Sequence, residues 1–145
     1  MNENASFWAC GNLTSTATDL FTVTSTNLIL AFADCSNFNQ NLTNLNISIV
    51  TRLASFFRNN NQQRFGFANW DINQVTDFVD FMSGSQGLLT SEYDATLISW
   101  NNQIPQTGRA ISFGGSKYTL GGAAAAARAS LISVYGWTIT DGGGI

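Results

Sequence analysis

The side chains that carry most enzyme chemistry are sparse in this sequence. Its 145 residues include no histidine, two cysteines, nine acidic and six basic residues, so the formal net charge is −3. Without an imidazole there is no Ser-His-Asp or Cys-His machinery and no histidine metal ligand. Cys10 and Cys35 are 25 residues apart and do not have the spacing of a zinc site. The composition predicts a protein that is not an enzyme and that has no cofactor and no metal site.

Three aspartates are the candidates for paired-carboxylate, acid–base chemistry. Asp77 and Asp80 are three residues apart on a short predicted helix, and Asp71 is nearby. Paired carboxylates catalyse proton transfer when a pocket raises the pKa of one of them, and no such pocket is evident here. We interpret these aspartates as a solvated helix face, and a calcium contact is the alternative.

A glycine-rich segment, Gly114-Gly115-Ser116-Lys117, has some features of a phosphate-binding loop. The phosphate-loop pattern requires lysine directly after its last glycine, and here a serine intervenes. We therefore interpret the segment as a glycine-rich hairpin turn.

Ligand binding is better supported between Arg58 and Arg64. This stretch, Arg58-Asn59-Asn60-Asn61-Gln62-Gln63-Arg64, places neutral amides between two guanidinium groups. Such groups can hydrogen-bond a sugar or a peptide backbone. The candidate ligand-binding residues are Arg58, Asn60, Asn61 and Arg64, and a degenerate repeat corner is the alternative interpretation.

A repeated scaffold must position these residues. A phenylalanine recurs at intervals of 24 or 25 residues, at Phe7, Phe32, Phe56 and Phe81, and residues 44–51 align with residues 69–76. This period fits one strand and one short helical turn per coil, stacked so that equivalent residues form ladders. We expect three coils over roughly residues 7–80. The third coil gains a residue on this alignment, so residues 58–64 are expected to bulge as a loop.

Each coil is expected to contain a short strand followed by a one-turn helix. The strands are expected near Leu13–Ala17, Phe38–Leu42 and Phe65–Ala68, and the helices near Asn27–Ala31, Thr51–Phe57 and Thr76–Met82. Thr51 and Thr76 occupy the positions of helix N-caps. Equivalent residues of stacked coils lie about 5 Å apart, so Cys10 and Cys35 are expected to stack inside. A disulfide between them would also require suitable Cβ directions.

Residues 85–145 lack the period, and we expect them to form a helix–strand–helix–strand cap on residues 1–84. A Ser91-x-x-Asp94 pattern predicts the start of the first helix, before Pro105. The other expected elements are a strand at Ala110–Phe113, a helix at Gly121–Val134 whose packing face is Ala123, Ala127 and Leu131, a left-handed Gly136, and a strand at Trp137–Thr140. Trp70, Trp100 and Trp137 are expected in the core.

The repeats resemble those of the BspA-like leucine-rich-repeat surface proteins, including the 25-residue-repeat bacterial lipoprotein group. Residues 32–40, Phe-Ala-Asp-Cys-Ser-Asn-Phe-Asn-Gln, are similar to the pattern F-x-x-C-x-x-F-N-Q of that family. Residues 69–76, Asn-Trp-Asp-Ile-Asn-Gln-Val-Thr, are similar to N-W-D-x-S-N-V-T, whereas Leu45 replaces the tryptophan one repeat earlier. Residues 93–100 and 135–142 resemble tails that follow such repeats in BspA-like and some phage-associated proteins.

This resemblance implies an α/β repeat fold, a short leucine-rich-repeat-like solenoid of about three coils with a C-terminal α+β cap. It also implies a non-catalytic, surface-exposed module for recognition or adhesion, whose partner would be a cell-surface glycan or protein. Six scattered basic residues on an acidic chain predict no nucleic-acid partner. No apolar run approaches the length of a membrane span, which predicts no membrane insertion.

Two observations at the N-terminus bear on where the protein acts. Residues 1–6 show no secretory signal. Because only six residues precede Phe7, the first coil is expected to be covered by another protein chain or by a copy of itself. Both favour a virion component at the virion surface, such as a tail-fibre, receptor-binding or capsid-decoration subunit. A bacterial BspA-like cell-surface adhesin, or a fragment of one, is the alternative.

Overall fold

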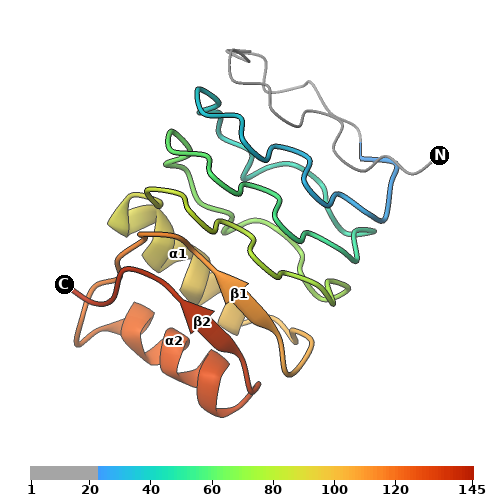
Figure 1. The fold of residues 1–145 in the computed structure, drawn as a ribbon. Helices are drawn as coiled ribbons and strands as arrows, with labels where there is room; N and C mark the ends of the chain where they lie inside the picture. Colours follow the sequence, from blue (N-terminus) through green and yellow to red (C-terminus); the bar gives the residue numbers. More distant parts are fainter. Residues whose placement is uncertain (1–22) are drawn as a thin grey trace.

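The computed structural model describes residues 23–145. The first predicted coil, with Phe7, Cys10 and the strand expected at Leu13–Ala17, lies outside the described residues. From residue 23 the chain winds through stacked layers and ends in a segment of two helices and two strands (Figure 1). These elements are α1 (Thr90–Asn101), β1 (Ala110–Ser112), α2 (Ala123–Ser133) and β2 (Thr138–Thr140). β1 and β2 pair in parallel, with Ala110 opposite Thr138 and Ser112 opposite Thr140.

Equivalent residues in neighbouring layers are 25 positions apart. Isolated parallel bridges join Asn27 to Arg52 and Arg52 to Asp77. On another edge of the same layers, the Asn69 side-chain amide donates to the Asn44 Oδ1 at 2.9 Å. The predicted solenoid remains a prediction, but the register that it requires is present over these residues.

The backbone within each layer does not form the predicted one-turn helices. The Leu53 N–H donates across layers to the Asp77 carbonyl at 2.8 Å, whereas the Phe56 N–H donates back to the Leu53 carbonyl at 3.2 Å. Ser55 and Asp80, which are 25 residues apart, both have positive φ angles, 55° and 57°. A helix would bond each N–H to a carbonyl four residues back along the chain. Since alternate N–H groups here bond to the next layer, the chain forms successive turns instead.

In the described layers, the predicted places of strands and helices are therefore wrong. Residues 38–42 and 65–68 are not strands, and the cross-layer bridges occur at the starts of the segments expected as helices. Thr51 and Thr76 do not cap helices. Their hydroxyls donate to the carbonyl oxygens of the residues 25 positions earlier, Thr26 and Thr51, at 3.1 and 3.2 Å.

The phenylalanine ladder is shifted by one residue from the predicted alignment. Phe57, not Phe56, stacks over Phe32, with ring centroids 5.6 Å apart and an interplanar angle of 22°. Phe56 stacks on Phe81 at 6.0 Å and 12°. The 25-residue spacing is therefore kept between the second and third repeats, and the extra residue expected at residues 58–64 does not exist.

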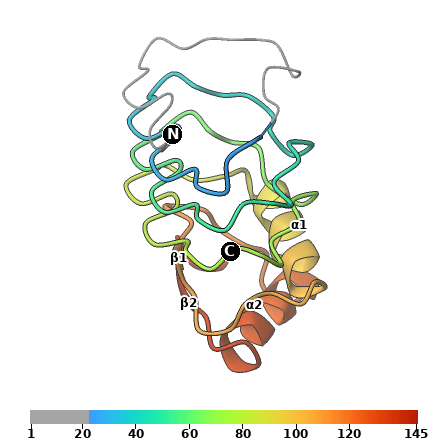
Figure 2. The ribbon, with the colours of Figure 1, turned by 90° about the vertical axis from the view of Figure 1, so that its right-hand side faces the viewer.

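The C-terminal segment covers the last layer from two sides (Figure 2). β1 continues the line of parallel bridges, because Phe78 bridges to Ile111 and the Met82 N–H donates to the Ser112 carbonyl at 2.8 Å. α1 lies against the other side, where the Phe67 N–H donates to the Thr96 hydroxyl at 3.0 Å. Within residues 23–145, neither helix has the length and apolar character needed to cross a membrane.

The helix α1 approaches the last layer closely at Gly66. A Cβ atom on Gly66 would lie 2.5 Å from the Glu92 carbonyl oxygen and 2.6 Å from the Thr96 hydroxyl. The Gly66 N–H also donates to the Glu92 carboxylate at 2.9 Å. Glycine at this position therefore lets the helix pack directly on the backbone of the layer.

The boundaries predicted in this segment are close to those observed, but two details differ. α1 begins at Thr90 after Leu89, with no side-chain cap, and Asp94 instead accepts hydrogen bonds from the Thr119 N–H and hydroxyl at 2.9 and 2.6 Å. The buried face of α2 is Ala124, Ala127 and Leu131, whereas Ala123 is exposed. Gly136 has a φ of 68°, as predicted.

A core of aromatic side chains joins the layers to the C-terminal segment. Trp70, Trp100 and Trp137 are buried, which confirms the prediction for these residues. Each indole N–H donates to a backbone carbonyl, for example Trp70 to Leu42 at 2.7 Å. The polar atoms of the core tryptophans are therefore satisfied within the protein.

Candidate functional site

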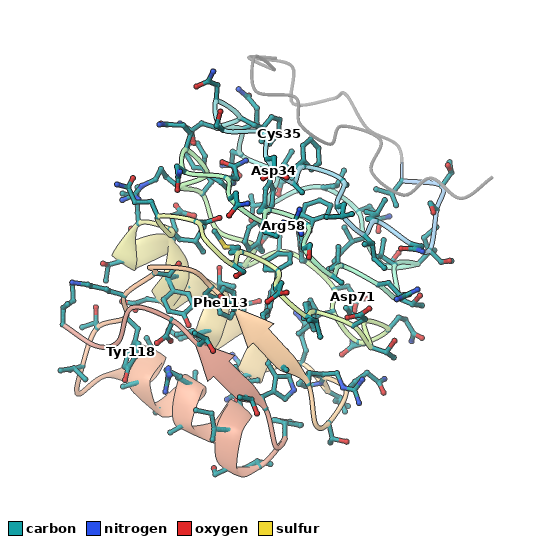
Figure 3. The ribbon with its side chains drawn as sticks, in the orientation of Figure 1. Asp34, Cys35, Arg58, Asp71, Phe113 and Tyr118 are labelled. Carbon is teal, nitrogen blue, oxygen red and sulfur yellow. The ribbon has the colours of Figure 1, made fainter. Side chains whose placement is uncertain are left out.

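The first candidate site, residues 58–64, does not present its predicted binding residues together. An Arg58 guanidinium nitrogen lies 3.3 Å from the Asp34 carboxylate, and the Asn59 amide donates to the same carboxylate at 2.8 Å. Figure 3 shows Asp34 and Arg58 in neighbouring layers. The guanidinium of Arg58 therefore forms an ion pair with a carboxylate of the neighbouring layer.

Asn60 is buried, which corrects its prediction as a ligand-binding residue. It takes the place that Cys35 has one layer earlier and Ser85 one layer later, and its N–H donates to the Ser85 hydroxyl at 3.2 Å. Its side-chain oxygen accepts the N–H groups of Gln62 and Gln63 at 3.1 and 3.0 Å. Because the side chain is 0% exposed, it organises the corner and does not face a ligand. Asn61 is exposed.

Arg64 belongs to a different feature, an open depression beside the start of α1. The depression has a volume of about 360 Å³ and is lined by Arg64, Gln86, Leu89, Thr90, Gly115 and Lys117, next to the buried Leu88. We call it the cationic depression. Of the four predicted binding residues, the structure places Arg64 here.

Both charged residues of the cationic depression lack an acidic partner. The ion pairs within residues 23–145 are Arg52–Asp77, Arg58–Asp34 and Arg128–Asp141. Among the described cations, Arg64, Lys117 and Arg109 are therefore outside any ion pair. Arg109 donates to the Thr76 carbonyl and does not line the depression. Two cations without a carboxylate partner thus line the cationic depression, although the chain as a whole has a negative net charge.

The sequence does not indicate Lys117 as a binding residue, because the pattern of its segment predicts a glycine-rich hairpin turn. The segment is a turn, with Gly114 at a φ of 60°. It is not a hairpin, since the strand before it pairs in parallel with β2. The Ser116 hydroxyl accepts the Leu88 N–H at 2.9 Å and donates to the Phe113 carbonyl at 2.6 Å. These bonds fix Ser116 and leave the exposed Lys117 beside the depression.

The three aspartates considered for acid–base chemistry do not lie on a helix face, since Asp77 forms the bridge to Arg52 and Asp80 lies in a turn. Asp77 pairs with Arg52 at 3.1 Å. Asp71 accepts the Asn73 N–H at 3.0 Å, and Asp80 is exposed. In the described part of the chain, no group of three or more histidine, cysteine, aspartate or glutamate side chains is placed to hold a metal ion.

A second group of interacting polar and charged residues lies within the C-terminal segment itself. The Asp141 carboxylate accepts the Tyr93 hydroxyl at 2.7 Å and the Arg128 Nε–H at 2.8 Å. The Arg128 guanidinium lies 5.1 Å from the centre of the Tyr118 ring. The Asp141 side chain is 3% exposed, so this group ties α1 and α2 to the chain after β2 and offers nothing to a ligand.

This network predicts a loss of stability at alkaline pH. Burial, followed by the hydrogen bond to Asp141, raises the pKa of Tyr93 far above its usual value. Above pH 10 a tyrosine in the unfolded chain loses its proton while Tyr93 keeps it, so the unfolded state binds fewer protons and folding stability falls. The contribution of one such group is about 1.4 kcal/mol per pH unit.

Urea denaturation of the wild type and Tyr93→Phe on both sides of pH 10 tests this expectation. The variant lacks the ionising group, so its stability should fall less steeply, and the gap between the two proteins should narrow with rising pH. Parallel stability curves would show that burial of the Tyr93 hydroxyl does not control this transition.

The layers also display polar side chains in register. Thr26, Thr51 and Thr76 form one ladder through their hydroxyl and carbonyl groups, and Asn44 and Asn69 form another. Thr51, Thr76 and Asn69 stand in partly or fully exposed positions. Such ladders present the same chemistry repeatedly on one surface.

Comparison with known proteins gives one result. A family model described as "Mycoplasma protein of unknown function, DUF285" matches residues 1–108. Neither the curated proteins nor the solved structures contain a match to this chain. The match spans all the described layers and α1.

Proposed function

We propose that this chain, which belongs to the DUF285 family, is a non-catalytic module for surface recognition. In this proposal, residues 1–84 form a leucine-rich-repeat-like solenoid of the BspA-like kind and residues 85–145 cap it. The observation that carries the proposal is the 25-residue register of exposed polar ladders, such as Asn44 with Asn69. Stacked repeats with extended, regular surfaces are typical of binding proteins.

Rigidity supports the same proposal. Backbone hydrogen bonds such as Ser55 to Val79 and Phe57 to Phe81, both at 2.8 Å, lock successive layers together. A surface held in this way loses little conformational entropy when it binds a partner. Because the exposed side chains are mostly neutral and polar, a glycan or a polar protein surface is the partner class that suits them.

We further propose that the module acts on the surface of a virion, as a tail-fibre, receptor-binding or capsid-decoration subunit. A second candidate is a bacterial cell-surface adhesin of the BspA-like kind. The description of the family favours this second candidate, because it names a bacterial genus. In both cases the partner is a cell-surface glycan or protein.

Localisation in the organism that produces the chain separates these candidates. Mass spectrometry of purified, protease-washed particles should detect the chain at a fixed ratio to capsid proteins if it belongs to a virion. Protease treatment of intact cells should remove it if it is an adhesin. Purified chain should also bind the envelope fraction of the target cell. A chain found only inside intact cells, with no envelope binding, would overturn the proposed surface role.

A further inference from the structure

We propose that the cationic depression binds an oxyanion, a carboxylate or sulfate group carried by a small molecule or by a larger ligand. This inference stands apart from the proposed surface location, because it depends on the charges and geometry of one hollow. The depression, of about 360 Å³, falls within the usual range of small-molecule sites, about 300 to 1,000 Å³.

The charges around the hollow favour an anion. Arg64 and Lys117 line it and have no carboxylate partner within 4.0 Å among residues 23–145. Glu92 and Asp94, the acidic residues closest in sequence to Thr90, form an ion pair with neither cation; Glu92 accepts the Gly66 N–H and Asp94 accepts from Thr119. A bound anion would supply the negative charge that the protein does not place there.

The guanidinium of Arg64 is held in position for this role. One of its terminal nitrogens donates to the Gly87 carbonyl at 2.7 Å. A guanidinium has five N–H donors in a planar fork, so donors remain for a ligand. Because the carbonyl of Gly87 fixes the fork, binding costs less side-chain entropy than it would for a freely moving arginine.

Hydrogen bonds also join the chain segments that line the cationic depression. The Leu89 N–H donates to the Arg64 carbonyl at 3.0 Å, the Leu88 N–H donates to the Ser116 hydroxyl at 2.9 Å, and the Gly115 N–H donates to the Ser85 carbonyl at 3.0 Å. Three chain segments far apart in sequence are thereby joined around one depression, so the site is preformed.

Neutral groups at the rim extend the surface beyond the anion itself. The amide of Gln86 and the hydroxyl of Thr90 can hydrogen-bond a neighbouring part of a ligand, and the 46% exposed Leu89 offers an apolar contact. α1 begins at Thr90 without a side-chain cap, but Glu92 in its first turn offsets the positive end of the helix dipole, so the positive field comes from the two cations. This combination suits an acidic group attached to a polar ring or chain.

NMR titration of the ¹⁵N-labelled full chain tests the proposal. The probes are sodium sulfate, sodium glucuronate and neutral glucose, at constant ionic strength maintained with sodium chloride. Sulfate, glucuronate or both should shift amide signals of residues 64, 86–90 and 115–117, whereas glucose should not. A response to sulfate alone would identify a site for a compact inorganic anion, and a response to glucuronate would identify one for an acidic sugar.

Variants that each remove one positive charge then show whether the anion binds in the cationic depression. Lys117→Gln removes one cation at an exposed position and should weaken binding about three- to fivefold, and Arg64→Gln should weaken it at least as much. Arg109→Gln, which removes an unpaired cation outside the depression, should leave binding unchanged. The proposal is overturned if no probe shifts these amides, or if binding by Lys117→Gln equals binding by both the wild type and Arg109→Gln.

Discussion

Replacement of Phe81 by alanine is expected to lower the free energy of unfolding by about 4 kcal/mol. The Phe81 side chain is 0% exposed. Its removal takes a large apolar surface out of the core and leaves a cavity, and both effects destabilise the folded state. The cost lies at the high end of such substitutions because the surroundings of this ring cannot easily collapse.

The rings around Phe81 come from segments that are fixed independently of one another. Phe56, one layer earlier, stacks on it at 6.0 Å. Trp100 of α1 lies at 6.4 Å and Phe113, directly after β1, at 6.2 Å. Each of these segments is held by its own backbone hydrogen bonds, such as Phe113 to Thr140 at 2.8 Å, so movement of one ring into the cavity would strain bonds elsewhere.

Urea denaturation measures the effect, with Val79→Ala as the matched control. Val79 lies two residues earlier in the same turn and is 52% exposed, so its truncation should cost less than about 0.5 kcal/mol. Phe81→Leu keeps much of the volume and should fall between the two variants. Equal losses for Phe81→Ala and Val79→Ala would show that the Phe81 ring does not join the layers to the C-terminal segment.

The period and the identity of the core residues could be predicted from the sequence. A residue type that recurs every 25 positions implies that equivalent positions share an environment, and large aromatic rings such as Trp70 and Trp100 are stable only when mostly buried. The C-terminal helices could be placed because their propensity and periodicity are local. β1 and β2 were bounded by glycines and could be placed for the same reason.

The structure inside each layer could not be predicted, because it depends on hydrogen bonds between residues 24 positions apart. The segment at residues 51–57 has the composition of a short helix, yet its N–H groups divide among the preceding layer, the next layer and its own turn. The adjacent Phe56 and Phe57 allowed two alignments with Phe32. Ring stacking in three dimensions was needed to choose between them.

Only part of the candidate site could be predicted from the sequence, and the reason is related. The amide-rich stretch at residues 58–64 has the composition of an exposed loop, but Asn60 lies inside, where its side-chain oxygen accepts the Gln63 N–H and its own N–H donates across layers to the Ser85 hydroxyl. Arg64 was identified, whereas Lys117 was not. These two residues are far apart in sequence, and Lys117 lies outside the repeats, so no pattern in the sequence relates them.

Replacement of Asp141 by alanine is expected to lower the free energy of unfolding by about 3 kcal/mol. The carboxylate, 3% exposed, accepts hydrogen bonds from the Tyr93 hydroxyl, from Arg128 and from the Gly143 N–H at 3.1 Å. Its loss leaves a hydroxyl without its acceptor and a guanidinium, 21% exposed, without its counter-charge. Deleting one member of a buried ion pair is costly because the remaining charge stays desolvated.

The exposed pair between Arg52 and Asp77 provides the control. The Arg52 side chain is 50% exposed, so Asp77→Ala should cost less than about 1 kcal/mol in the same urea denaturation. Replacing both buried charges, in the double variant Asp141→Leu with Arg128→Met, should recover part of the stability lost in Asp141→Ala, because no unpaired charge then remains. If the double variant is instead less stable than Asp141→Ala, the penalty does not arise from an uncompensated Arg128, and the hydrogen bonds to Tyr93 and Gly143 must carry the loss.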